Sequence, residues 1–184
     1  NKLLDNADKK SFNFAKAFGV IGDEYNIDRE WLGQKMLTPS KHQQSRMAQY
    51  PLFMKPDEKI SVEDVAELLS ATYKGTALEG KSKRPIRVER QLESHIIQLR
   101  EQMPKELQGV IWQSFGVLPE SVLVPLYSSL TDYPKAYQIG DDTYSDDSAY
   151  WQFRSLTALA SANPDKYLPI LKATWDEEET QLYK

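Results

Sequence analysis

The 184-residue sequence contains no cysteine. This absence excludes disulfide bonds, thiolate metal sites and a cysteine nucleophile within these residues. With His42 and His95 as its only histidines, the chain also offers too few ligands for a typical zinc site. No apolar run approaches the roughly 18 residues that a membrane-spanning helix needs, so we expect no membrane segment. We also expect no bound metal or organic cofactor.

The chain has no excess of positive charge: it has 23 basic and 27 acidic side chains and a net charge of −4. An acidic chain is a poor candidate for binding a phosphate backbone, so no nucleic-acid partner is expected. Hydrophobic residues make up 40% and charged residues 27%, as is typical of globular proteins. The length predicts a single domain over residues 1–184.

The two ends of the sequence suggest a piece of a longer polypeptide. The chain begins with Asn1, and residues 176–184 have a helical composition without a glycine or proline that would end the helix. No charged-then-apolar leader occurs in this stretch. We therefore expect a cytoplasmic protein, although any leader peptide would lie outside this chain.

The clearest predicted helix begins after Ser61, which forms an S-x-x-[DE] capping box with Asp64. Apolar residues then follow at helical spacing as far as Tyr73, and Gly75 is placed to end the helix. Further helices are predicted over residues 11–18 and 28–37. Others should follow the cap residues 145–148 and the Asn163-Pro164 pair.

Strand-like segments occupy the middle of the chain. Residues 94–100 and 109–116 are short, rich in apolar and β-branched side chains, and close enough to form a hairpin. Residues 121–127 form a third candidate, which Pro125 restricts to a sheet edge or a bulge. The predicted class is α+β, with helices flanking a small mixed or antiparallel sheet.

One motif match has the wrong context. Residues 75–82 (GTALEGKS) satisfy the phosphate-binding pattern G-x-x-x-x-G-K-[ST]. That chemistry needs a strand before the first glycine and a helix that begins at the Lys-Ser pair. Here a predicted helix precedes the motif, and Arg84-Pro85 follows it. A P-loop nucleotide hydrolase is therefore disfavoured.

His95 is the more interesting histidine because Glu93 lies on the same face of the predicted strand and can orient the imidazole. The structural alternative, a sheet histidine satisfied by a carboxylate, is favoured. Aspartates at 141, 142, 146 and 147 lack the spacing of a calcium loop and are explained by helix capping.

A basic segment follows the first strong helix. Its members are Lys81, Lys83, Arg84, Arg87, Arg90 and, later, Arg100. Two interpretations remain open: a site for the carboxylate or phosphate of a small ligand, or a solvated loop paired with nearby glutamates. Trp112, in the middle of a predicted strand, belongs either to a pocket wall or to the core.

Several longer segments carry a family resemblance. They are residues 54–69 (MKPDEKISVEDVAELL), 73–76 (YKGT), 84–86 (RPI), 93–96 (ESHI) leading to Arg100, 109–112 (GVIW), 115–116 (FG), 124–127 (VPLY) and 150–154 (YWQFR). In these motifs and their order, the chain resembles the bacterial dipeptidase A family. The resemblance covers most of the sequence.

The resemblance implies an N-terminal-nucleophile (Ntn) hydrolase with an αββα sandwich, which cleaves dipeptides without a cofactor. Members of the family use a cysteine at the mature N-terminus, whose α-amine acts as the base. This chain departs from that pattern, because it begins with Asn1 and has no cysteine. It aligns with the C-terminal portion of the family, so no catalytic residue is carried over.

We therefore expect the C-terminal part of a cysteine dipeptidase, inactive as an isolated chain, whose partners are a dipeptide substrate and the N-terminal catalytic half. The predicted substrate-binding residues are Arg84, Glu93, His95, Arg100 and Trp112, with Arg84 placed to bind the terminal carboxylate of the dipeptide. The alternative is a non-catalytic peptide-binding or assembly module. A homo-oligomer remains open.

Overall fold

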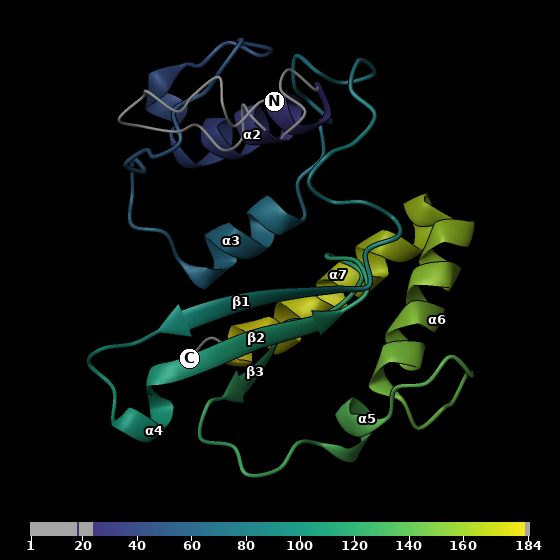
Figure 1. The fold of residues 1–184 in the computed structure, drawn as a ribbon. Coiled ribbons are helices and arrows are strands. Elements are labelled where there is room, and N and C mark those ends of the chain that lie inside the picture. Colours follow the sequence, from purple (N-terminus) through teal and green to yellow (C-terminus); the bar gives the residue numbers. More distant parts are fainter. Residues whose placement is uncertain (1–17, 19–23, 183–184) are drawn as a thin grey trace. The chain divides into compact units, whose positions relative to one another are not determined.

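The computed structural model describes residue 18 and residues 24–182 (Figure 1). Residue contacts group the chain into two compact units. The first comprises residues 1–58 and 73–85, and the second comprises residues 59–72 and 86–184. Each unit is described by itself, and the single folding domain expected from the length stays a prediction.

The first unit is built on helix α2 (Glu24–Leu37), followed by a 3-10 turn, η2 (Pro39–Lys41). The helix predicted over residues 28–37 is thus confirmed and begins earlier, at Glu24. The predicted helix over residues 11–18 lies outside the described residues except for Phe18. The core of this unit is formed by Trp31, Leu32, Tyr50, Tyr73 and Leu78.

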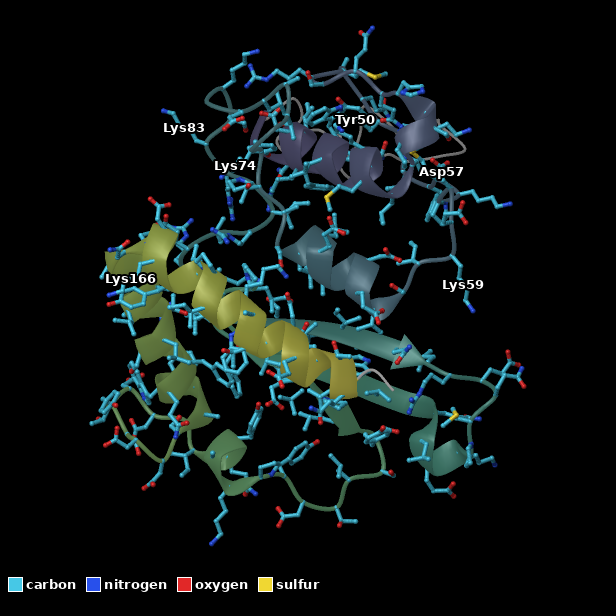
Figure 2. The ribbon with its side chains drawn as sticks, turned by 180° about the vertical axis from the view of Figure 1, so that it is seen from behind. Tyr50, Asp57, Lys59, Lys74, Lys83 and Lys166 are labelled. Carbon is cyan, nitrogen blue, oxygen red and sulfur yellow. The ribbon has the colours of Figure 1, made fainter. Side chains whose placement is uncertain are left out.

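Two hydrogen-bonded contacts fix the loop after α2. Trp31 Nε1 donates to the Gln43 carbonyl at 2.9 Å. The Asp57 carboxylate, labelled in Figure 2, accepts bonds from the backbone N–H and the hydroxyl of Ser40, both at 2.7 Å. These bonds join the two ends of the segment between Ser40 and Asp57, which has no helix or strand after η2.

The second unit contains an antiparallel three-stranded sheet of order β1-β2-β3. Its strands are β1 (Glu93–Leu99), β2 (Gly109–Phe115) and β3 (Val124–Tyr127). The hairpin of β1 and β2 confirms the prediction and encloses the short helix α4 (Lys105–Gln108). β3 is shorter than predicted, and Pro125 lies on this edge strand, where a missing N–H is tolerated.

Helix α3 (Val62–Leu69) has the predicted capping box. The Asp64 N–H donates to Ser61 Oγ at 3.1 Å, and the Ser61 N–H donates to Asp64 Oδ2 at 2.7 Å. The predicted extension to Tyr73 is wrong, because the helix ends at Leu69. The hydroxyl of the following residue, Ser70, donates a hydrogen bond to the Ala66 carbonyl at 2.8 Å. Such a bond from a side chain to the backbone competes with continuation of the helix.

The two predicted C-terminal helices are present as α6 (Ala149–Ala162) and α7 (Pro164–Leu182), and a short helix that was not predicted, α5 (Lys135–Gln138), precedes them. Asn163 caps α7, since its Oδ1 accepts from the Lys166 N–H at 3.3 Å, and Pro164 is the first helical residue. Ser148 stands at the N-cap of α6, yet its hydroxyl donates to the Ile139 carbonyl instead.

The sheet has one covered and one open face. Helix α7 runs along the covered face, behind the strands in Figure 1 and in front of them in Figure 2. The buried core on this side consists of Val62, Ile96, Val110, Trp112, Leu118 and Leu123. The opposite face bears Glu93, His95, Ile97, Leu99, Ile111, Gln113 and Phe115 and is called the open face below.

These elements confirm the α+β class with helices flanking a small antiparallel sheet. Among the described helices, none combines the length and apolar character required to cross a bilayer.

Candidate functional site

Glu93 and His95 form a polar cluster with Gln113 on the open face. The His95 Nδ1–H donates to Glu93 Oε2 at 3.0 Å, as predicted from their alternation along the strand. Gln113, the cross-strand partner of His95, donates from Nε2 to the same oxygen at 3.2 Å. Among the described residues, no hydroxyl is hydrogen-bonded to the imidazole, and its ring contact is with the Glu93 carboxylate.

The hydrogen bonds keep Glu93 ionised. Partial burial acts to raise the pKa of this carboxyl, but the bonds from His95 and Gln113 outweigh it, and the pKa lies below its ordinary value. The Glu93 side chain is nonetheless 46% exposed. The open face therefore presents an oriented, accessible negative charge.

An aromatic cluster begins at the residue opposite Glu93. Phe115 lies directly opposite Glu93 in the β1–β2 register. Its ring centroid is 5.1 Å from that of Tyr137 in α5 and 6.2 Å from that of Tyr150 in α6. Figure 1 shows α5 and α6 near the end of the sheet where β1 begins and β2 ends. Sequence reasoning missed Gln113 and Phe115, although the hairpin register would have paired them with His95 and Glu93.

Trp112 lies on the other face of the sheet. It is buried in the core, and its indole N–H donates to Gln98 Oε1 at 3.1 Å. Because neighbouring residues of a strand point to opposite faces, Trp112 supports the sheet from the side away from Glu93 and His95. Of the two interpretations of this ring, the geometry favours the core.

Arg100 is engaged at the turn of the hairpin. One guanidinium nitrogen, Nη2, donates to the Leu107 carbonyl at 2.6 Å. The guanidinium carbon also lies 5.3 Å from the ring centroid of Tyr127, within the range of a cation–π contact. These contacts connect the end of β1 to α4 and β3.

Arg84 belongs to the first unit, whereas the other four predicted residues belong to the second. Its backbone carbonyl accepts a hydrogen bond at 3.0 Å from the hydroxyl of Tyr73, a core residue of that unit. The backbone at Arg84 is therefore fixed by the core.

The segment resembling a P-loop forms turns. Gly75 and Gly80 have positive φ angles of 73° and 70°, which favour glycine. The Glu79 carboxylate accepts from the Gly75 N–H at 2.8 Å, and Lys81 Nζ donates to the Ala77 carbonyl at 3.0 Å. The Gly75 N–H, which a bound phosphate would need as a donor, is thus already hydrogen-bonded to a carboxylate. This geometry agrees with the prediction that disfavours a nucleotide site.

A groove between α3 and α7 was not predicted. Its volume is about 410 Å³, and its lining includes the apolar side chains of Leu118 and Trp175 and the carboxylates of Glu63 and Glu67. The described residues contain no group of three or more histidine, aspartate or glutamate side chains arranged to hold a metal ion.

Comparison with known proteins identifies the family. The model of Peptidase family C69 matches residues 1–177. The chain is 32% identical over 162 residues to "Probable dipeptidase A" of Streptococcus pyogenes, covering 81% of this chain and 35% of that protein. It is 31% identical over 173 residues to "Probable dipeptidase B" of Lactococcus lactis, covering 86% and 36%.

A third relative, "Dipeptidase A" of Lactobacillus helveticus, is 27% identical over 192 residues, covering 97% of this chain and 40% of the relative. The chain thus spans little more than a third of the length of the curated relatives that it matches. Because the family model extends over nearly all of the sequence, the chain belongs to Peptidase family C69.

Proposed function

We propose that this chain is the C-terminal part of an Ntn-type cysteine dipeptidase whose nucleophile lies outside the 184 residues. One observation carries the proposal: the family match covers residues 1–177, while the chain spans only 35–40% of its relatives and contains no cysteine. The substrate class follows from the dipeptidase names of the relatives.

In the chemistry implied by the family resemblance, one N-terminal cysteine supplies both the nucleophile and the base. The free α-amine of the N-terminal cysteine, with a pKa of about 7.7–8.0, accepts the proton of the thiol as the sulfur attacks the peptide carbonyl. The proton then passes to the departing amine as the peptide C–N bond breaks, and water hydrolyses the acyl-enzyme. Hydrogen-bond donors stabilise the tetrahedral intermediate. In this proposal the present chain supplies one sheet of the sandwich and part of the wall around the substrate.

The open face of the sheet supports the proposal. Ile97, Leu99 and Ile111 are 65%, 82% and 38% exposed, and Ile97 lies directly opposite Ile111. Apolar side chains on adjacent strands form a contiguous patch, which a second sheet about 10 Å away would cover in a sandwich. We propose that the missing N-terminal part supplies this second sheet.

The predicted site residues divide into two roles in this proposal. Glu93 and His95 face the substrate, and Arg84 binds the terminal carboxylate through its guanidinium, the preferred partner of a planar anion. The contacts of Arg100 and Trp112 support a wall-forming role, in which they hold the hairpin that carries Glu93 and His95.

The test compares the complete polypeptide that carries this chain with the isolated 184 residues. We expect the complete protein, with a processed N-terminal cysteine, to hydrolyse dipeptides, and the isolated chain to have no activity. Replacement of that cysteine by alanine should abolish turnover without unfolding the protein, and metal chelation should leave activity unchanged.

The alternative is a non-catalytic peptide-binding or assembly module, which would also account for the absence of cysteine within the chain. It predicts a complete polypeptide that lacks a processed N-terminal cysteine and binds dipeptides without cleaving them. Mass spectrometry of the mature N-terminus separates the two functions.

A further inference from the structure

We propose that Glu93 anchors the free α-ammonium group of the substrate and thereby makes the enzyme selective for peptides with an unblocked amino terminus. The proposal rests on the dipeptidase function proposed above and names the part of the substrate that the open face recognises. It is carried by the hydrogen bonds, exposure and aromatic neighbours of this one carboxylate.

The ion-pair partner of Glu93 is His95, whose imidazole carries a charge only when it is protonated. The hydrogen-bond donors to the carboxylate are an imidazole and an amide, from His95 and Gln113, and no lysine or arginine forms an ion pair with it among residues 24–182. A carboxylate offers about four lone-pair positions. The exposed part of the group therefore retains capacity for an ammonium donor.

The carboxylate is also held in place before any ligand arrives. His95 is its neighbour on β1, and Gln113 reaches it across the ladder from β2, so donors from two strands restrict its rotation. A group that is already oriented loses less conformational entropy when it binds a ligand. Such an arrangement suits a fixed anchor better than a mobile surface glutamate.

The aromatic ring opposite Glu93 can contribute to binding a cation. Phe115 lies opposite Glu93, and Tyr137 and Tyr150 pack around the Phe115 ring. The π face of an aromatic ring attracts an ammonium group, and the attraction grows when water is excluded. A carboxylate with aromatic neighbours therefore matches the charge and the apolar surroundings of an amino-terminal residue.

A dipeptidase has a use for such an anchor. A dipeptide differs from an internal stretch of a longer peptide by carrying a free ammonium and a free carboxylate, one residue apart. Recognition of the ammonium by Glu93 would reject N-blocked peptides, because an N-acetyl group removes the positive charge that the carboxylate attracts.

The test uses the complete polypeptide and two probes, alanyl-alanine amide and its N-acetylated form, with dissociation constants measured by titration calorimetry. Neither probe has a carboxylate, so the difference between their dissociation constants reports the free ammonium group. We expect the wild type to prefer the free amine and Glu93→Gln to bind it about 10- to 100-fold more weakly, as for loss of a charged hydrogen bond. Glu101→Gln, an exposed change just beyond β1, is the matched control.

Equal binding of the free amine by wild type and Glu93→Gln, or no binding of it by the wild type, would overturn the anchor. Carboxyl NMR of the wild type gives a second readout: the Glu93 resonance should shift on addition of alanyl-alanine amide while that of Glu101 stays. Dipeptide hydrolysis is measured separately, so a protein that binds but does not hydrolyse contradicts the proposed function and not the anchor.

Discussion

At the scale of single residues, Glu120 is a buried acid of the second unit. It is only 7% exposed, and its Oε2 has no hydrogen-bond partner. Burial raises the pKa of the carboxyl above its ordinary value, and the nearby positive charges of Arg87 and Arg154 offset only part of this effect, while Glu89 adds to it. Folding therefore shifts the equilibrium of this carboxyl toward its protonated form, relative to the unfolded chain.

The raised pKa predicts a pH-dependent stability. An acid whose pKa is higher in the folded state contributes stability that is complete below its unfolded value of 4.5 and is lost as the pH rises through its folded pKa. We expect Glu120→Gln to remove this loss, so that the variant gains in unfolding temperature over the wild type as the pH rises from 4.5.

Thermal unfolding of both proteins at several pH values, compared as a difference, isolates the contribution of Glu120. A difference in unfolding temperature that is the same at every pH would contradict the prediction. No sequence pattern distinguished Glu120, because its shift arises from the loop and α6 residues that enclose it.

At the scale of elements, the capping box of α3 gives a direct prediction. The Ser61 hydroxyl satisfies the Asp64 N–H, which would otherwise be an orphan donor at the helix start. Ser61→Ala should lower the free energy of unfolding by about 1 kcal/mol, measured by urea denaturation. Ser45→Ala, outside any regular helix, is the control, and an equal effect of the two changes would rule out a capping contribution.

Element boundaries were predictable where the determinant is local. The cap of α3, the start of α7 at Pro164 and the edge position of Pro125 each depend on residues within one turn or on the chemistry of a single proline. The end of α3 was not predictable in this way. Tyr73 has the right spacing for the helix stripe, yet it is buried in the first unit, a contact that no periodicity encodes.

At the scale of the whole molecule, the open face should govern association of the isolated chain. An uncovered apolar sheet face tends to find a second copy. We therefore expect the 184 residues to self-associate, and Leu99→Lys to reduce this association by placing a charge on the patch. Sedimentation velocity measures the effect directly.

Leu52→Lys is the matched control, because Leu52 is similarly exposed at 85% but lies in the first unit. Association that persists in Leu99→Lys and disappears in Leu52→Lys would assign the interface to another surface. In the complete polypeptide, Leu99→Lys should instead weaken the packing of the proposed N-terminal sheet and lower activity.

The sequence by itself determined the α+β class, the hairpin, the pairing of Glu93 with His95 and the resemblance to dipeptidases. Strand alternation and helix capping act over a few residues, and family motifs persist as sequence. Only the tertiary structure decided that Trp112 supports the sheet from its covered face, that Arg100 is engaged at the hairpin turn, and that Gln113 and Phe115 flank Glu93. These outcomes depend on register and on which face the helices cover, and both are set by contacts between residues distant in the chain.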